Sequence, residues 1–208
     1  MVLLGTSMAN RSIFHSAFAE VRRPVRLIIF LVLGCVLSAL YPSDLSQYPI
    51  LPNGSEVPLE VTSTEAYIRF VPTLVQIAVP LLLGDKVGLV QLLYIGVSTS
   101  IATHGLKFML NDRWIGNTRL GQRPHGGSHN MPSGHSSMVS CAVYFVGRRY
   151  DLWLGLLLAA ILMLTMYARV ILNAHTISAV IAGALLGLLT AAVFTSARSE
   201  QNLLPARI

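Results

Sequence analysis

The sequence predicts an all-α integral membrane protein with six transmembrane helices and with both termini in the cytoplasm. Hydrophobic residues make up 53% of the chain and charged residues only 12%, whereas soluble domains carry about 25% charged residues. Six apolar stretches can be read as helices in a bilayer of about 30 Å. The expected organisation is a cytoplasmic segment over 1–24, one membrane domain over 25–196 and a cytoplasmic tail over 197–208.

The six expected helices cover residues 25–41, 66–84, 87–108, 134–147, 152–172 and 175–196. The first follows an arginine cluster that ends at Arg26, and it begins too far into the chain for a typical cleaved signal peptide. The fourth is short and is expected to tilt or to extend toward Arg148. The sixth carries Gly183 and Gly187, which favour close packing between helices.

The charges of the loops predict the orientation in the membrane. The loop over 42–65 has acidic residues but no Lys or Arg, which places it outside and the N-terminus in the cytoplasm. The loop over 107–124 breaks this rule because it is basic and yet falls on the outer side. Its basic residues are Lys107, Arg113, Arg119 and Arg123. Binding of an anion explains these charges, and nucleic acid is not expected because no basic stripe interleaves with aromatic residues.

Three separated segments are expected to meet on this outer face. The run Met131-Pro-Ser-Gly-His135 opens the fourth helix, where backbone N–H groups without helical partners bind anions. Arg169 lies near the end of the fifth helix and His175 at the start of the sixth. A break near Leu172-Asn173 lets both face one pocket. Together with Arg123 of the basic loop, these residues are sufficient for cleavage of a phosphate monoester.

The residue types predict the roles needed for phosphoryl transfer. Arg123, Arg169 and Lys107 can neutralise the phosphoryl oxygens. Ser133 and the amides around Gly134 can bind the same oxygens. One histidine can attack phosphorus while the other protonates the leaving oxygen. No Asp/Glu cluster is available for Mg²⁺, so neither a metal nor another cofactor is expected.

Three motifs resemble the signature of the type 2 phosphatidic acid phosphatase superfamily. They are Arg123-Pro124, Pro132-Ser-Gly-His135 and Arg169-x5-His175. The sequence around these motifs is most similar to bacterial lipid A 1-phosphatases, and the resemblance covers about residues 65–196. It implies a six-helix bundle in a bacterial inner membrane, with a site on the periplasmic face that removes phosphate from a lipid.

The resemblance also implies a role for each motif residue. His175 would be the nucleophile that forms a phosphohistidine, and His135 would protonate the leaving group. The residues implied to bind the phosphate are Lys107, Arg123, Ser133, Gly134 and Arg169. The implied reaction removes the 1-phosphate of lipid A, and water then attacks phospho-His175. A less anionic outer surface and weaker binding of cationic peptides would follow.

The chain departs from the superfamily pattern at three positions. Gly116 stands where the pattern has a lysine, so Lys107 would have to reach the phosphate from an enlarged loop. Ala179 replaces the aspartate that orients the nucleophilic histidine. That role is left to Asp112, to a backbone carbonyl or to no group at all. Ala168 replaces the serine that leads the third motif.

Other reactions and another class of function stay open at this stage. The same chemistry could act on undecaprenyl pyrophosphate or phosphatidylglycerol phosphate, or could transfer the phosphoryl group to a second lipid. The rival of another class is a non-catalytic lipid-binding or transport protein, and only Ala179 favours it. The sequence does not predict an oligomeric state.

The remaining histidines and one arginine have structural interpretations. His104 is interpreted as a packing residue inside the third helix. His125 and His129 are interpreted as solvated loop residues, with contact to a second phosphate or a sugar as the alternative. Arg69 forms either an ion pair with Glu65, one helical turn earlier, or a contact with a lipid headgroup.

Overall fold

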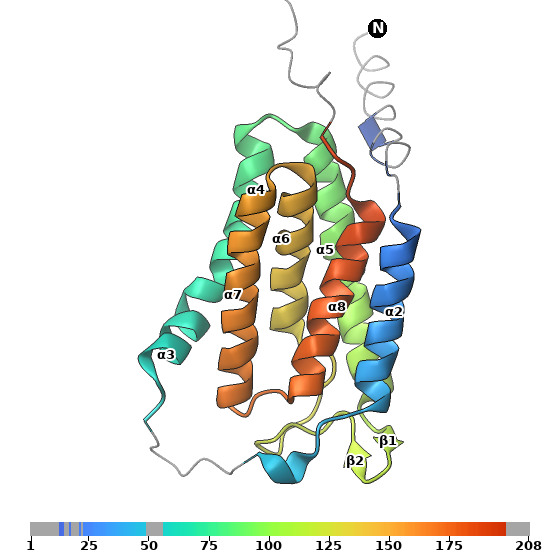
Figure 1. Ribbon diagram of the computed structural model, residues 1–208, viewed down its shortest axis with the longest axis vertical. Helices are drawn as coiled ribbons and strands as arrows, with labels where there is room; N and C mark the ends of the chain where they lie inside the picture. Colours follow the sequence, from blue (N-terminus) through green and yellow to red (C-terminus); the bar gives the residue numbers. More distant parts are fainter. Residues whose placement is uncertain (1–12, 15–16, 18–20, 22, 49–55, 199–208) are drawn as a thin grey trace, which may run out of the picture.

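Helices make up most of the chain that the computed structural model describes, which comprises residues 13–14, 17, 21, 23–48 and 56–198. The principal helices run side by side along the long axis (Figure 1). They are α2 (Val25–Leu40), α4 (Val71–Leu82), α5 (Lys86–Leu110), α6 (Gly134–Arg149), α7 (Leu152–Ile171) and α8 (Ile177–Phe194). The shorter elements are α3 (Leu59–Ala66), 3-10 turns at Leu45–Gln47 and Ile68–Phe70, and strands β1 (Trp114–Ile115) and β2 (Thr118–Arg119). Most of the expected cytoplasmic segment 1–24 and tail 197–208 lies outside the described residues.

Three of these helices are long and apolar enough to cross a membrane: α5, α7 and α8. A fourth candidate combines α3 with residues 68–82 and is bent by 41°. The apolar helix α2 is shorter, with 16 residues, and α6 also has 16 residues. Each of the six expected apolar stretches therefore coincides with a helix. Three or four of them meet the criteria of length and composition for a membrane span.

The second expected helix, over 66–84, differs most from its expected bounds. Its regular part begins only at Val71, because the chain bends at Tyr67 (φ −136°, ψ −53°) and continues through a 3-10 turn. The bend directs α3 and the turn against α7. It thereby brings Glu65 and Arg69 next to residues that lie far away in the sequence.

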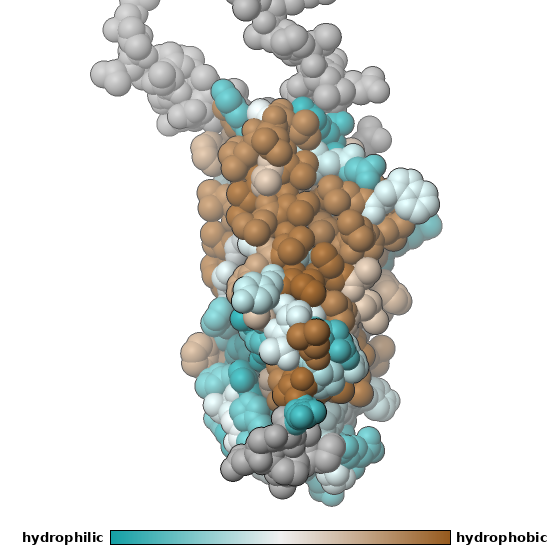
Figure 2. All heavy atoms as spheres, turned by 90° about the vertical axis from the view of Figure 1, so that its left-hand side faces the viewer, coloured by the Kyte–Doolittle hydropathy of each residue, from teal (hydrophilic) through white to brown (hydrophobic). Residues whose placement is uncertain are grey.

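The outer surface of the helices is strongly apolar. Figure 2 shows a broad hydrophobic band over one face, with hydrophilic residues gathered toward the end of the molecule that carries β1 and β2. Leu157 and Met163 of α7 are among the large apolar side chains exposed on this surface. Contiguous exposed apolar surface of this extent is typical of helices that face lipid.

Helix α6 forms the centre of the bundle, because it packs against α4, α5, α7 and α8 (Figure 1). Its apolar side chains Phe145 and Val146 are fully buried in a core shared with α5, α7 and α8. Its buried serines bond within the helix, and Ser137 Oγ donates to the carbonyl of Ser133 at 3.0 Å. The helix therefore buries polar residues without leaving these hydroxyl groups unpaired.

The contact between α6 and α8 depends on glycine, as the sequence predicts. A Cβ atom at Gly183 would meet the backbone of Ser133, and one at Gly187 would meet Ser137 and Ser140. The absence of these side chains lets the two helix backbones approach closely. Because Ser133 immediately precedes α6, this packing also fixes the start of that helix.

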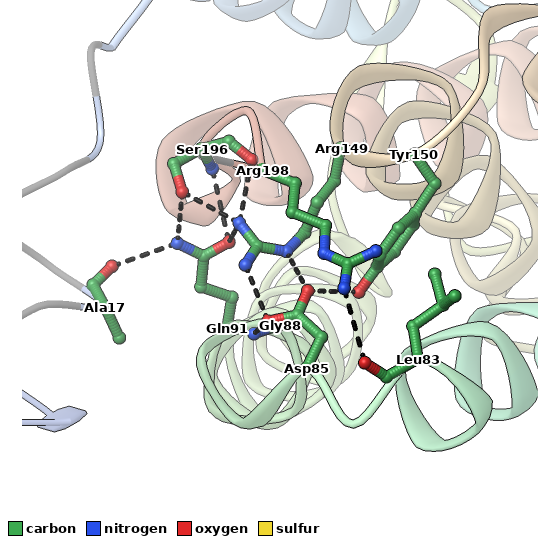
Figure 3. Close-up of polar contacts among 9 residues, drawn as sticks. All are labelled: Ala17, Leu83, Asp85, Gly88, Gln91, Arg149, Tyr150, Ser196 and Arg198. Atoms are coloured by element: carbon green, nitrogen blue, oxygen red, sulfur yellow. Dashed lines mark hydrogen bonds and ion pairs between the residues drawn. The ribbon is translucent and has the colours of Figure 1, made fainter. Parts of the chain in front are cut away.

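A buried ion pair joins the helices at the end of the bundle where α5 begins and α6 ends, away from β1 and β2 (Figures 1 and 3). Arg149 donates to the carboxylate of Asp85 from Nε at 2.7 Å and from Nη2 at 2.8 Å, and Tyr150 donates to the same group at 2.8 Å. Burial raises the pKa of Asp85, but the hydrogen bonds from Arg149, Gly88 and Tyr150 outweigh it and hold the pKa below its ordinary value. Arg149 also donates to Ser196, so the cluster joins the start of α5, the end of α6 and the chain after α8.

The loop between α5 and α6 contains the only strands among the described residues. They pair antiparallel, with Trp114 opposite Arg119 and Ile115 opposite Thr118. Gly116 lies in the connecting turn at φ +56°, a conformation that glycine adopts without steric cost. This backbone requirement explains why glycine occupies the position at which the superfamily pattern has a lysine.

Candidate active site

The candidate site lies at the hairpin end of the bundle, where α6 begins and where α7 turns into α8 (Figure 1). Helix α7 ends at Ile171, and Asn173 adopts φ +51° before α8 begins at Ile177. The predicted break near residues 172–173 is therefore confirmed. It allows Arg169, in the last turn of α7, and His175 to line the same cavity.

A cavity of about 690 Å³ contains most of the residues singled out from the sequence. The candidate residues in its lining are Lys107, Arg123, Gly134, His135, Arg169 and His175. Its apolar part is contributed by α5 and α6, through residues such as Leu92, Ile95 and Met138. The cavity thus combines a cationic part with an apolar part.

Ser133 is the one candidate residue whose side chain the structure does not place in the cavity lining. It is fully buried, and its hydroxyl accepts a hydrogen bond from Ser136 Oγ at 3.1 Å. Its backbone N–H donates to the carbonyl of Ala179 at 2.9 Å. In this structure Ser133 therefore fixes the start of α6 against α8. The sequence prediction missed this placement because it assumed that the whole motif faces the ligand.

His175 is 2% exposed, and its ring is held by a backbone carbonyl. Its Nδ1 lies 2.7 Å from the carbonyl oxygen of Asn130. Burial, and then the positive charges of Lys107, Arg169 and Arg123, hold the pKa of this imidazole well below its ordinary value. His175 is therefore neutral at physiological pH, as a nucleophile must be.

The structure distinguishes among the alternatives left open by Ala179. Ala179 is fully buried and packs with Leu120 and Met131. Asp112 is exposed and pairs with Arg119, so it does not hold the ring of His175. The group in contact with Nδ1 is the backbone carbonyl of Asn130.

His135 belongs to a polar cluster that the sequence prediction did not assemble. Its Nε2 lies 2.9 Å from Nη1 of Arg69. Arg69 forms an ion pair with Glu65, which confirms one of its two interpretations. The same oxygen of Glu65 accepts from Nη1 of Arg169 at 2.7 Å. The carboxylate therefore bridges an arginine of the motif and an arginine outside it.

The basic loop separates into two groups of residues. Lys107 and Arg123 line the cavity, and Lys107 is positioned by donating to the carbonyl of His129 at 2.8 Å. The ion pair of Arg119 with Asp112 belongs to the hairpin, and neither Arg119 nor Arg113 appears in the cavity lining. The excess positive charge on this loop is thus only partly directed at the site.

The electrostatics of the cavity favour an anion. Burial, and then the charge of Arg169, lower the pKa of Arg123. The Nε atoms of Arg123 and Arg169 are buried and have no hydrogen-bond partner among the described residues. A phosphoryl group offers several acceptor oxygens to such donors. The described residues contain no group of three His, Cys, Asp or Glu side chains placed to hold a metal ion.

The other histidines lie in different surroundings. The ring of His129 contacts Phe108 edge to face at 5.3 Å between centroids, and its Nδ1 lies 2.8 Å from Ser128 Oγ. Neither His125 nor His129 lines the cavity. His104 does line it, and its Nδ1 lies 2.9 Å from the carbonyl oxygen of Ser100 on its own helix.

Comparison with known proteins gives consistent matches. The model of the PAP2 superfamily matches residues 88–203. The Lipid A 1-phosphatase of Helicobacter pylori strain J99 is 42% identical over 174 residues, which are 84% of this chain and 89% of that protein. The Lipid A 1-phosphatase of Helicobacter pylori strain 26695 is 42% identical over 171 residues, or 82% of this chain and 88% of that protein. No solved structure matches.

Proposed function

Because the chain belongs to the PAP2 superfamily, we propose that it is a membrane phosphatase that removes the 1-phosphate of lipid A. The observation that carries this proposal is the convergence of two histidines and three cations on one cavity. These residues are His135, His175, Lys107, Arg123 and Arg169. The apolar part of the cavity lining suits a lipid rather than a soluble phosphate ester.

The arrangement supports a reaction in two steps. In the first, Nε2 of His175 attacks phosphorus, the bond between phosphorus and the sugar oxygen breaks, and His135 gives that oxygen a proton. In the second, water attacks phospho-His175 while His135 takes a proton from it. Inorganic phosphate leaves, and both histidines return to their starting states. Arg123 and Arg169 stabilise the charge on the phosphoryl oxygens during both steps.

The contact between Arg69 and His135 requires a change when the substrate binds. A guanidinium can only donate, so Nε2 of His135 carries no proton while Arg69 lies 2.9 Å from it. His135 must carry a proton to act as the acid. We therefore expect the phosphoryl group of the substrate to attract Arg69 away from His135. Arg69 and Arg169 would then pair with the same anion.

The proposed location is the bacterial inner membrane, with six spans and with the cavity on the periplasmic side. The apolar exposed surface and the coincidence of all six expected stretches with helices support it. The basic loop over 107–124 supports an outer site because two of its four basic residues, Lys107 and Arg123, line the cavity. These two charges are explained by a bound anion and need not indicate a cytoplasmic loop. Removal of the phosphate would reduce the negative charge of the outer surface and weaken the binding of cationic peptides.

The decisive assay is phosphate release from lipid A 1,4′-bisphosphate by the purified protein in detergent, without added metal, with the lipid products resolved by mass. We expect loss of the 1-phosphate alone in the wild type and in the loop variant His125→Ala, and no loss in His175→Ala. If phosphate is released from undecaprenyl pyrophosphate or phosphatidylglycerol phosphate but not from lipid A, and this release depends on His175, the mechanism holds and the substrate is another lipid. No release from any of these lipids would reject the phosphatase proposal.

A further inference from the structure

The ring of His175 is oriented by a group that the superfamily pattern does not contain. We propose that Asn130 is a positioning residue: its backbone carbonyl sets the orientation and tautomer of His175, and its side chain holds that carbonyl in place. This inference rests on the proposed role of His175 as the nucleophile. It extends that role by naming the residue that replaces the missing aspartate at Ala179.

The first step of the argument is the tautomer of His175. A carbonyl oxygen can only accept, so the 2.7 Å contact with Asn130 requires the proton of the neutral ring to lie on Nδ1. The lone pair then belongs to Nε2, and His175 lines the cavity among the cations. A ring fixed in this way presents one nitrogen to phosphorus without first changing its tautomer.

The second step concerns the side chain of Asn130, which is 3% exposed. Its Nδ2 donates to Thr176 Oγ1 at 3.0 Å, and its Oδ1 accepts from the backbone N–H of Thr176 at 3.1 Å. One amide thus makes two hydrogen bonds to the residue that follows His175. The carbonyl of Asn130, the ring of His175 and the backbone of Thr176 thus form a closed set of contacts. The ring of His175 cannot turn in this arrangement without breaking a contact to Asn130.

The third step is the anchoring of Asn130 on its other side. Its backbone N–H donates to the carbonyl of Gly121 at 2.9 Å, within the loop that carries Arg123. Asparagine is suited to this place because one side chain offers both a donor and an acceptor. An alanine would leave the carbonyl of residue 130 present, but without its two links to Thr176.

The surroundings of Ala179 explain why an aspartate is not used here. Ala179 is fully buried beside Leu120, Met131 and Ala182. A carboxylate in such a position is costly unless it is paired. A backbone carbonyl bears no net charge, so it can occupy a buried place next to the ring and still accept the Nδ1 proton.

The test compares Asn130→Ala with Asn130→Asp and with Tyr48→Phe. The hydroxyl of Tyr48 accepts from the backbone N–H of Ile177 at 2.8 Å, so Tyr48→Phe removes one hydrogen bond from the same segment without affecting the ring. We expect Asn130→Ala to lower kcat about 10- to 100-fold, by analogy with the loss seen when the partner of a metal-binding histidine is removed, with little change in KM. Asn130→Asp should retain more activity than Asn130→Ala, because its carboxylate can accept from the N–H and the hydroxyl of Thr176, but less than the wild type, because it buries a charge. Tyr48→Phe should resemble the wild type.

A second measurement follows the tautomer directly and does not depend on turnover. Nitrogen NMR of ¹⁵N-histidine-labelled protein, with the His175 signals assigned by His175→Gln, should show the proton on Nδ1 in the wild type and a mixture in Asn130→Ala. A wild-type proton on Nε2 would overturn the inference, as would a folded Asn130→Ala variant with normal kcat. If Asn130→Ala does not fold, the tautomer of His175 in the wild type decides the inference.

The two proposals fail in distinguishable ways. Full turnover by His175→Ala would reject His175 as the nucleophile, whatever the NMR spectra show. An inactive His175→Ala variant together with normal kcat in folded Asn130→Ala would retain the phosphatase and reject the positioning role.

Discussion

Arg123 illustrates how much the site depends on the shape of single side chains. Its guanidinium shares the cavity with Arg169 and has an Nε without a partner among the described residues. We predict that Arg123→Lys lowers kcat/KM by at least about 10-fold, since an ammonium cannot make the two-pronged contact of a guanidinium with phosphoryl oxygens. Steady-state kinetics on the lipid substrate measure this. Near-normal kcat/KM would show that Arg123 does not bind the phosphate.

His175 gives a prediction about pH. Burial and the three neighbouring cations lower its pKa, so the neutral form should persist as the pH falls below about 6.5, the ordinary value for histidine. NMR titration of the ligand-free protein should find His175 still neutral at pH 5.5. Titration of His175 near pH 6.5 would contradict the burial and charge that the structure assigns to it.

At this scale the sequence predicted most of the motif side chains that line the cavity, while their roles in catalysis stay predictions. His135, Arg123 and Arg169 were found because the chemistry restricts their types and spacing. Asn130 was not identified as a positioning residue, because every residue has a backbone carbonyl and the contact leaves no signature of residue type. The link from Arg69 to His135 joins residues 66 positions apart, and no local pattern encodes that distance.

Among the contacts between helices, the one between α6 and α8 leaves the least room for a larger side chain. Replacing glycine by alanine inside a helix normally stabilises it by about 0.5–1 kcal/mol. At Gly183 we predict the opposite, a loss of about 1–3 kcal/mol, because the new methyl group would collide with the backbone of Ser133. Thermal unfolding in detergent measures the change, and activity should fall because the start of α6 moves.

Gly105 provides the matched control on α5, since a Cβ atom there would have no neighbour within 4 Å. Gly105→Ala should leave the unfolding temperature unchanged or raise it slightly. If Gly183→Ala also left the unfolding temperature unchanged or raised it, the close approach of α6 and α8 would be contradicted.

The sequence predicted the helices well and their bends poorly. Apolar stretches mark where a helix can lie in a membrane, and all six coincide with helices. The bend of 41° between α3 and residues 68–82 could not be predicted, because both sides of Tyr67 are compatible with a helix. The bent segment packs against α7, and a tertiary contact of this kind leaves no local pattern in the sequence.

For the whole molecule, the two ends of the bundle have separate tasks: one contains the cavity, and the other contains the buried pair of Asp85 and Arg149 (Figures 1 and 3). Asp85→Asn preserves the size of the side chain and its capping of α5, but it leaves Arg149 without a counter-charge. We predict a loss of about 3–5 kcal/mol, as for other broken buried pairs, and a lower unfolding temperature. The exposed neighbour Lys86→Gln is the control and should unfold like the wild type.

Because this pair lies at the far end from the cavity, Asp85→Asn protein that remains folded should retain its KM for the lipid. A large increase in KM without a loss of stability would contradict the separation of the two ends.

The central claim is that His175 becomes phosphorylated during turnover. Its most direct test is a rapid-quench experiment, in which the protein is mixed with lipid A labelled with ³²P at the 1-phosphate and the reaction is stopped within milliseconds to seconds. The labelled peptide is then mapped under alkaline conditions. The account predicts a transient label on His175 that appears before inorganic phosphate is released and is absent from His175→Ala. Phosphate release by the wild type with no label on His175 at any time, or with the label on another residue, would contradict it.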